Sequence, residues 1–517
     1  MKQIKGRSQH AFGNKALLLI LFVGLAVRLF PLDTSFFFWD ETVYLLHANA
    51  LSGQEVGYTE FDIRPPLLPL LLSFPVRLGF NLETSSRIIL AVLNSLAILV
   101  AYYFGSRISR RTGIIASLLV ALLPFHVLAS RWVMTDALAA LLSALAILFA
   151  HNGPSSFINS LYMHNSTSRR DTKKNAHYSI FNANYFASGI FFGLALLTKF
   201  TSLIMLVPLS LFFFAGHRKL RRSVPLIPVL NFFIAVFVCI VPYLISNQLQ
   251  FGNSVYPFAR AFHVVVENNP VSIFFSLESV FDFFGIWIIF FVIGTAYAIH
   301  WSLLKKGGSK LSIKTLAGDE TKGGKTGMEK QANGFEANRM LIFVLLLWAL
   351  TSLAYYFFIL QRGVAKPPTI EWEAERFLLP ALIPVLVICS AYLSRLRDKT
   401  IALMMVAFVL FQMNSISRVY IPSIEMEDGF RAATKDMATY VTSNIPANSA
   451  IYCKLNCPVI SYYSHRKVMQ LSQSVVYEPG NYAILFSTDL EPQVYSRLPL
   501  VHSIRQGKWE AELYRID

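Results

Sequence analysis

A pair of acids, Asp40 and Glu41, follows the aromatic run "FFFW" near the start of the chain, and Arg64 opens the later stretch "RPPLLPLL". A carboxylate can accept the proton of a hydroxyl group, and the planar guanidinium of arginine matches two oxygens of a phosphate. Acids beside strongly apolar sequence are costly to place. Because the acid pair has no adjacent base and no evident structural use, we predict a functional role for Asp40.

Other ionisable residues stand where apolar runs begin or end: Asp136 in "ASRWVMTDALAAL", Lys199 in "LALLTKFTSLI" and Arg376 in "EWEAERFLLPALIP". We predict that Asp136, together with Glu41, orients the substrate or a metal ion. The cations Arg64, Lys199 and Arg376 are predicted to bind phosphate. An alternative for Asp136 is a simple helix N-cap, and Lys199 sits in a tight hairpin with little water.

A second set of polar residues is expected around these groups: Tyr44, Arg131, Tyr256, His263 and Glu267. A lone histidine is more often a packed or surface side chain than a ligand. Several further arginines at the ends of apolar runs are expected to be anchors whose charge reaches the membrane surface: Arg28, Arg77, Arg87, Arg260 and Arg362.

The composition is that of a membrane protein. Of 517 residues, 54% are hydrophobic and only 15% are charged, where a soluble domain carries about 25% charge. The apolar runs predict a mainly α-helical membrane domain over residues 1–419 and a small α/β domain over residues 420–517. The net charge of +16 does not indicate nucleic acid, because most of the charges lie between apolar segments.

A helix needs about 20 apolar residues to cross a bilayer. On that basis we expect eleven spans, at about 16–32, 87–106, 113–130, 136–151, 183–198, 201–216, 224–246, 280–303, 340–360, 377–394 and 400–418. The first run is longer than a usual signal-peptide core and has no A-x-A-like site after it, so we interpret it as an uncleaved span. The shorter, Pro-rich run 65–79 is expected to lie in the membrane interface.

Lys and Arg are distributed unevenly between the alternate loops. One side receives 26 of them and the other side, before the last span, receives ten. The positive-inside rule therefore places the N-terminus in the cytoplasm. The long loops 33–86, 247–279 and 361–376, and the C-terminal domain, fall outside, and we favour a plasma membrane. The Gly- and Lys-rich loop 304–339 is expected to be a mobile cytoplasmic linker.

The C-terminal 98 residues have a different pattern. The stretch 429–446 predicts an amphipathic helix, and 449–464 and 480–488 predict short β-strands bounded by Pro, Gly and Asn. Cys453 and Cys457, in "CKLNC", could form a disulfide, a metal site or two free thiols. An oxidising compartment favours the disulfide.

On this topology the ionisable residues gather on the outer side, which predicts a polar cavity at the outer membrane surface. Carboxylates and cations together at such a surface suit a sugar that is linked through phosphate to a lipid carrier. The lipid stays in the bilayer, the phosphate lies at the interface and the sugar reaches the acid.

The motifs "WDE", "RPPLLPLL", "SRWVMTDAL", "GLALLTKFTSLI", "FGNSVYP" and "ERFLLPALIP" follow one another over residues 16–400. With them the chain resembles the GT-C membrane glycosyltransferases of the protein O-mannosyltransferase and aminoarabinose-transferase type. The resemblance implies a polyprenyl-phosphate sugar donor, a protein, lipid or glycan acceptor, and inversion at the anomeric carbon. It implies that Asp40 is the catalytic base or positions the acceptor hydroxyl, and that Asp136 helps to hold substrate or metal. It implies Arg64 and Arg376 as phosphate-binding residues, and it leaves Mg or Mn open as a cofactor.

The resemblance has limits. Aminoarabinose transferases typically carry Lys before Pro-Pro, where this chain has Arg64, so neither that donor nor a lipid A acceptor is implied. The sequence has no "WWD" motif, so transfer of a whole oligosaccharide is not expected.

Two other functions fit parts of the pattern. A secondary transporter would have a similar number of spans, but it would place charges near the bilayer midplane and often show internal repeats. A non-catalytic sugar-binding or assembly subunit would not need Asp40 to meet a phosphate-binding arginine.

Overall fold

The computed structural model describes most of the chain, namely residues 2–30, 39–58, 61, 63–166, 182–220, 226–267, 280, 283–284, 287–297, 299, 340–357, 376–415, 421–453, 456–471, 479–486, 498–507 and 509–516. The predicted linker 304–339 and most of loop 361–376 lie outside these residues. The chain divides into two compact units. We call residues 1–28, 92–129 and 136–413 the helical unit, and residues 29–91, 130–135 and 414–517 the loop–sheet unit.

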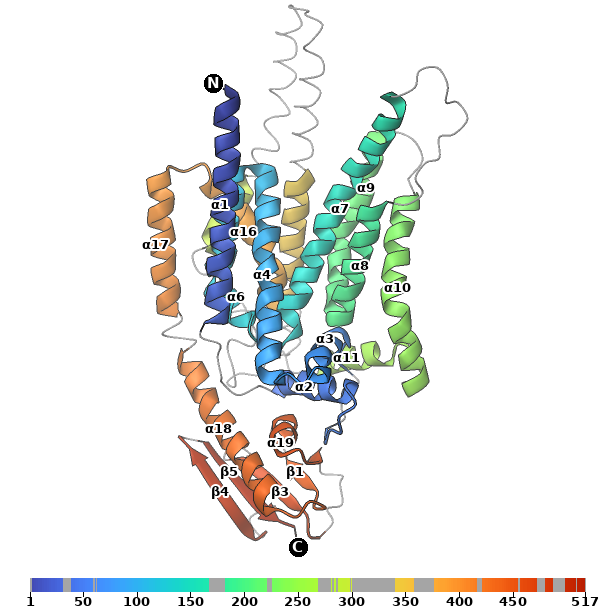
Figure 1. Ribbon diagram of the computed structural model, residues 1–517, viewed down its shortest axis with the longest axis vertical. Helices are drawn as coiled ribbons and strands as arrows, with labels where there is room; N and C mark the ends of the chain where they lie inside the picture. The colour runs from blue at the N-terminus through green and yellow to red at the C-terminus, as the bar shows by residue number, and fades with distance from the viewer. Residues whose placement is uncertain are drawn as a thin grey trace, which may run out of the picture. The chain divides into compact units, whose positions relative to one another are not determined.

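The helical unit consists of apolar helices (Figure 1). They are α1 (Lys2–Leu29), most of α4 (Leu82–Ile108), α5 (Arg110–Leu122), α6 (Pro124–Ala129), α7 (Thr135–Ser166), α8 (Ala183–Thr198), η1 (Phe200–Met205), α9 (Leu206–Leu220), α10 (Leu226–Phe251), α11 (Tyr256–Glu267), Trp287–Tyr297, Met340–Phe357, η2 (Arg376–Leu378), α16 (Leu379–Leu393) and α17 (Asp398–Ser415).

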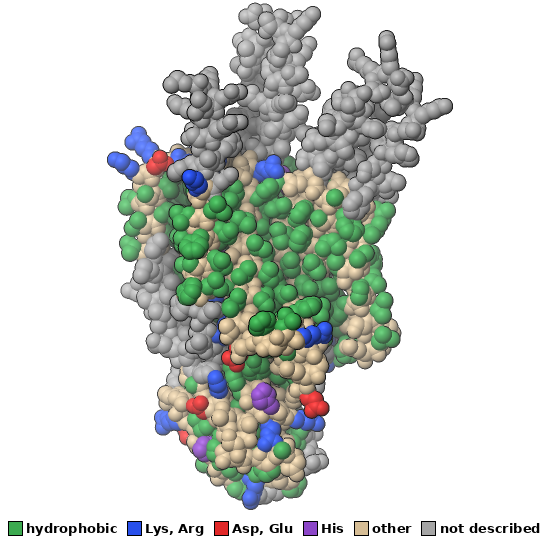
Figure 2. Space-filling model, viewed as in Figure 1, with side chains coloured by type: hydrophobic (Ala, Val, Ile, Leu, Met, Phe, Trp, Pro, Cys, Tyr) green, Lys and Arg blue, Asp and Glu red, His purple; other side chains and the backbone are tan. Residues whose placement is uncertain are grey.

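Five of these helices are long and apolar enough to cross a membrane: Leu82–Ile108, Thr135–Asn152, Val229–Phe251, Met340–Phe357 and Arg376–Leu393. On α10, large apolar side chains such as Phe237 (62% exposed) and Val238 (59% exposed) face outward. Figure 2 shows the visible face of the helices covered by apolar side chains, with Lys and Arg at its margin. Such a surface requires lipid rather than water around it. The protein is therefore an integral membrane protein, and the count of eleven spans stays a prediction.

Two predicted spans are irregular. The run 113–130 is broken into α5 and α6, because Leu123 is extended (φ −65°, ψ 115°) before Pro124. A proline disfavours the helical conformation of the preceding residue and has no N–H to donate. The run 201–216 starts as the 3₁₀-helix η1 and becomes α-helical only at Leu206.

Arg28 is not a surface anchor, and the prediction for it was wrong. It is completely buried, and its guanidinium donates to the carbonyl oxygens of Val120 and Ala121 at 3.0 Å each and to Nδ1 of His126 at 2.7 Å. The last carbonyls of a helix have no intrahelical partner. Arg28 satisfies those of α5 and so joins α1 to α5 and α6.

The loop–sheet unit contains α2 (Trp39–Leu51), α3 (Leu67–Arg77), the first turns of α4, α18 (Ile421–Asn444), α19 (Cys457–Ser464) and five strands. The strands are β1 (Ile451–Cys453), β2 (Val468–Gln470), β3 (Tyr482–Phe486), β4 (Leu500–Gln506) and β5 (Trp509–Arg515), in the order β2-β1-β3-β5-β4. β1 is parallel to β2 and β3, and β5 is antiparallel to β3 and β4. The helix α18 packs on this mixed sheet (Figure 1), and it includes most of the stretch 429–446 that was predicted to be helical.

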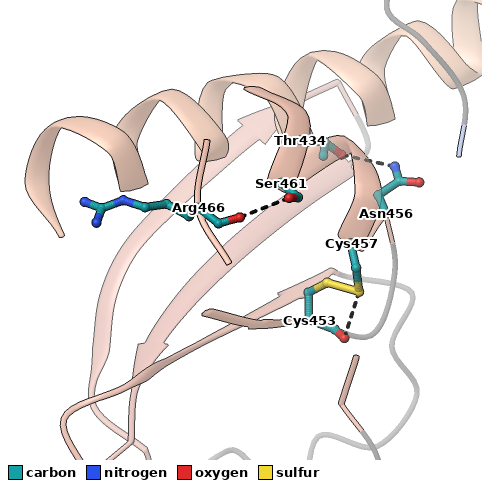
Figure 3. The surroundings of a disulfide bond; sticks show 6 residues. All are labelled: Thr434, Cys453, Asn456, Cys457, Ser461 and Arg466. Atoms are coloured by element: carbon teal, nitrogen blue, oxygen red, sulfur yellow. Dashed lines mark hydrogen bonds between the residues drawn. A yellow bond between two sulfur atoms is a disulfide. The ribbon is translucent and has the colours of Figure 1, made fainter. Parts of the chain in front are cut away.

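The stretch 449–464 was predicted to be β-rich, and this is only half right. Ile451–Cys453 is a strand, but Cys457–Ser464 is the helix α19. Pro458 lies in the first turn of α19, where the missing N–H costs nothing. A disulfide joins Cys453 to Cys457, with a Cα–Cα distance of 5.7 Å, and Asn456 donates to Thr434 Oγ1 at 3.3 Å (Figure 3). Of the three alternatives left open for Cys453 and Cys457, the structure has the disulfide.

The segment that contains α2 and Gly57, between α1 and α3, packs on the sheet. Trp39, at the start of α2, lies against the buried core between α18 and the strands. Val43 and Leu46 of α2 pack with Tyr58 and Tyr462. The carbonyl of Gly57 accepts a hydrogen bond from the N–H of Val468 at 3.3 Å. This bond attaches the segment to the edge strand β2. The acids of α2 are thus held by the C-terminal part of the chain.

Candidate active site

The helix α2 carries the acid pair in its first turn. Acidic side chains near a helix N-terminus are favourable because they face its partial positive charge. Residues spaced by four and three positions share one face of a helix, so Asp40, Tyr44 and His47 line one face of α2. The segment that ends at Arg64 covers this face.

Asp40 and Arg64 form an ion pair, with 2.9 Å between Oδ1 and a terminal guanidinium nitrogen. The side chain of Asp40 is 29% exposed and that of Arg64 is 15% exposed. Arg64 is fixed by a turn, in which its N–H donates to the carbonyl of Phe61 at 3.0 Å, and by the two prolines that precede α3. The pair therefore combines an accessible carboxylate with a cation that is held in place.

Tyr44 lies between the pair and the segment that precedes α7. The guanidinium carbon of Arg64 is 5.4 Å from the centroid of the Tyr44 ring, a cation–π distance. The Tyr44 hydroxyl is 3.4 Å from Thr135 Oγ1. Burial lowers the pKa of Arg64, but the nearby Asp40 and Tyr44 raise it, and the net shift is upward. Arg64 is therefore a permanent cation in the position predicted for phosphate binding.

Glu41 points away from the exposed carboxylate. It is 2% exposed, and its Oε1 accepts a hydrogen bond from the N–H of Val133 at 2.8 Å. Arg131, two residues earlier, lies in the same short segment, Ser130–Thr135. Glu41 thus ties α2 to this segment.

His47 completes the polar face of α2. Its ring stacks on Phe61, with centroids 4.6 Å apart and planes 5° apart. Burial, and secondly the charge of Arg64, lower the pKa of His47 to about 4. Its Nδ1 is buried and, among the described residues, has no hydrogen-bond partner, and the same holds for Nε of Arg64.

A second polar cluster lies in the helical unit. Asp136 is in the first turn of α7 and is 6% exposed. Lys199, in extended conformation between α8 and η1, donates from Nζ to Asp136 Oδ1. The predicted acid and the predicted cation are therefore brought together as a largely buried ion pair.

The two predicted cations Lys199 and Arg376 meet at one aromatic ring. The Nζ atom of Lys199 is 4.4 Å from the centroid of Phe377, and the guanidinium carbon of Arg376 is 5.2 Å from it. A pocket in this unit is lined by several of these residues and their neighbours, among them Asp136, Ser143, Lys199, Thr201, Tyr355 and Phe377. Of the two cations, Lys199 lines this pocket and is paired there with Asp136, while Arg376 lies beside the ring of Phe377.

Three other predicted residues lie on α11, and their described contacts are local. The Tyr256 hydroxyl accepts a hydrogen bond from Arg260 at 2.8 Å, and its ring stacks on Phe251. His263 is exposed, and the side chain of Glu267 lies outside the described residues. The described contacts thus link neither Tyr256 nor His263 to the two clusters.

A divalent metal site is not formed by the described residues, where no three His, Cys, Asp or Glu side chains come together. Asp136 is engaged by Lys199, and Glu41 by a backbone N–H. This donor set does not fit Mg or Mn, and no step of the reaction proposed below uses a metal ion.

Four residues at these two clusters were not among the predicted ones: His47, Thr201, Tyr355 and Phe377. His47 could have been found from its spacing, because it lies seven residues after Asp40 on the same helix face. Tyr355 could have been noticed as a polar aromatic residue inside an apolar span. Phe377 carries no sequence signal, since a phenylalanine at the start of an apolar helix is ordinary.

No protein-family model matches the chain, and no curated protein matches its sequence. Its structure is similar to crystal structures of ArnT, an aminoarabinose transferase, from Cupriavidus metallidurans. For the form bound to undecaprenyl phosphate the TM-score is 0.61 and the identity 13%, and for the apo form they are 0.61 and 14%. Each comparison covers 98% of both chains. A structure of the Archaeoglobus fulgidus oligosaccharyltransferase, tethered to an acceptor peptide, gives a TM-score of 0.48 at 15% identity, over 88% of this chain and 63% of that one.

The ArnT comparisons extend over nearly the whole chain, so the likeness includes both the membrane helices and the C-terminal sheet. The protein has the GT-C fold of membrane glycosyltransferases, as the motif order predicted.

Proposed function

We propose that this protein is a membrane glycosyltransferase that moves one sugar from a polyprenyl-phosphate carrier to an acceptor hydroxyl on the extracytoplasmic face. The observation that carries the proposal is the Asp40–Arg64 pair, a partly exposed carboxylate 2.9 Å from a fixed guanidinium. The GT-C fold supports the class of reaction, and the ArnT structure with bound undecaprenyl phosphate supports the class of carrier.

In the proposed reaction the acceptor hydroxyl attacks the anomeric carbon while Asp40 takes its proton. The bond between that carbon and the phosphate oxygen breaks, and the polyprenyl phosphate leaves with the bonding electrons. Arg64 stabilises the negative charge that grows on the leaving phosphate. Arg376 and Lys199, the two predicted cations of the helical unit, are also proposed to bind phosphate. One displacement inverts the anomeric carbon, and no covalent sugar–enzyme intermediate is needed.

The remaining predicted residues have supporting roles in this proposal. Asp136 orients Lys199 and the sugar, and Glu41 positions α2. The topology proposed here keeps the N-terminus in the cytoplasm and the C-terminal domain outside, in a plasma membrane.

The test is a transfer assay with purified protein in lipid, given a panel of polyprenyl-phosphate donors with radiolabelled hexoses and pentoses. Wild type is compared with Asp40→Asn and with Asp398→Asn. Asp398 is a matched control, because it also pairs with an arginine, Arg111, but is 94% exposed. We expect label to leave the lipid with wild type and Asp398→Asn, and a loss of at least about a hundredfold with Asp40→Asn.

Equal rates for Asp40→Asn and wild type would remove Asp40 from the chemistry. A protein that binds a donor but never releases its sugar would fit the non-catalytic subunit, and sugar movement across the membrane without transfer would fit the transporter.

A further inference from the structure

Two buried atoms at the polar face of α2, one on the helix and one on the segment that covers it, are not used by the proposed reaction. They are Nδ1 of His47 and Nε of Arg64, and neither has a hydrogen-bond partner among the described residues. Buried polar atoms are nearly always hydrogen-bonded in folded proteins, so each such atom calls for an explanation. Both atoms belong to side chains that lie along the same face of α2 as Asp40.

The packing around these atoms keeps both side chains in place. The His47 ring is stacked on Phe61, and the N–H of Arg64 is bonded to the carbonyl of Phe61. The other end of the guanidinium is committed to Asp40. The stack fixes the plane of the His47 ring, and the guanidinium of Arg64 cannot turn to another partner without giving up the ion pair.

The two atoms need different hydrogen-bond partners. Nε of arginine is always a donor, because the guanidinium stays protonated. With a pKa of about 4, His47 is neutral near pH 7, so one of its ring nitrogens is an acceptor. In the tautomer that carries the ring proton on Nε2, this acceptor is Nδ1. A hydroxyl group meets both needs at once, because it accepts one hydrogen bond and donates another. With His47 in this tautomer, a carboxylate or a phosphate would satisfy only Nε of Arg64, and an ammonium group would satisfy only Nδ1 of His47.

We propose that Nδ1 of His47 and Nε of Arg64 together bind one hydroxyl of the sugar donor beside Asp40, and so select which sugar is transferred. The inference rests on the proposed function and adds a residue that sets its donor specificity. Arg64 then has two roles, one toward the leaving phosphate and one toward the sugar. A water molecule has the same hydrogen-bonding chemistry, and the experiment separates the two sources.

The test compares donors that each lack one hydroxyl, in wild type, His47→Phe and His47→Asn. Phenylalanine keeps a ring for the stack on Phe61 but has no acceptor. Asparagine loses the ring but keeps an amide oxygen near the position of Nδ1. For wild type we expect one particular deoxy donor to have a kcat/KM about tenfold lower than its parent.

For His47→Phe, we expect that deoxy donor and its parent to have the same kcat/KM, so that the penalty disappears. The other deoxy donors should have the same penalties as in wild type. His47→Asn should keep part of the penalty. This is a double-mutant cycle between one side chain and one substrate hydroxyl. A merely structural role of His47 would lower kcat/KM for every donor by the same factor.

If wild type transfers sugar but His47→Phe and wild type show the same penalties, the subsite is wrong and the proposed function stands. In that case a water molecule or packing alone explains His47. If wild type transfers from no donor, the proposed function fails and the subsite fails with it. The imidazole ¹⁵N resonances of His47, measured with and without a bound donor, provide a readout without turnover: the Nδ1 signal should shift with the parent donor and not with the critical deoxy donor.

Discussion

Arg64 lies 2.9 Å from Asp40 and at the same time 5.4 Å from the centre of the Tyr44 ring. A planar guanidinium can make both contacts, because it donates along its edge and stacks with its face. The residue before Pro65-Pro66 thus both fixes the proposed base and carries a charge for the phosphate.

Replacing Arg64 by Lys keeps the charge but not the planar fork. We expect Arg64→Lys to lower the transfer rate about tenfold and Arg64→Ala about a hundredfold, because one ammonium group cannot hold Asp40 and lie flat on Tyr44 together. Initial rates with one fixed donor measure this. If Arg64→Lys were as active as wild type, charge alone would be required at this position.

The Asp136–Lys199 pair is largely buried, with side chains 7% and 21% exposed. Removing one partner leaves the other charge buried and unpaired, which typically costs about 3–5 kcal/mol. We expect Asp136→Asn or Lys199→Met to lower the midpoint of thermal unfolding strongly, and the double variant to recover stability but not activity. Asp398→Asn should leave the midpoint unchanged, since exposed pairs contribute little. Additive losses in the double variant would contradict the pairing.

Glu41 is expected to be a positioning residue. Glu41→Gln keeps an acceptor for the N–H of Val133, so its transfer rate and stability should stay near those of wild type. Glu41→Ala leaves that N–H buried without this partner, at a cost of about 1–3 kcal/mol in the free energy of unfolding. Chemical denaturation in detergent compares the two. A large loss of activity in Glu41→Gln, with full stability, would instead indicate that the charge of Glu41 takes part in the reaction.

Gly57 lies so close to the loop before β2 that a side chain does not fit. A Cβ atom there would be 1.8 Å from the carbonyl oxygen of Arg466. We expect Gly57→Ala to separate the segment that contains α2 and Gly57 from the sheet. It should also speed proteolysis of residues 414–517 and lower the transfer activity. Gly429→Ala is the control, because its nearest neighbour would be 3.2 Å away. Equal proteolysis of the two variants would show that this contact is not needed.

The depressed pKa of His47 predicts how stability depends on pH. Burial, and secondly the charge of Arg64, lower its pKa from 6.5 to about 4 in the folded protein. Between pH 4 and pH 6.5, His47 binds a proton more readily in the unfolded chain than in the folded protein. The contribution of His47 to the free energy of unfolding is therefore complete above pH 6.5 and declines as the pH falls toward 4. Unfolding midpoints of wild type should fall over this range by more than those of His47→Phe. Parallel curves would mean that His47 does not titrate as described.

Several elements could be predicted from sequence because their causes are local. The apolar runs specify membrane helices, and the pattern of 429–446 produces α18. The break before α6 was not predicted, although its cause, Pro124, is also local. The error at Cys457–Ser464 is also local in origin. Ile and Tyr favour strands, but Pro458 is well placed to begin a helix.

The sequence by itself determined which chemical groups are present and that they stand at the ends of apolar runs. The tertiary structure decided their partners: Asp40 with Arg64, Asp136 with Lys199, and Glu41 with the N–H of Val133. It also decided that Arg28 is buried rather than at the surface. The physical reason is that spacing along a helix fixes a shared face, whereas a hydrogen bond or ion pair between distant segments depends on how those segments pack.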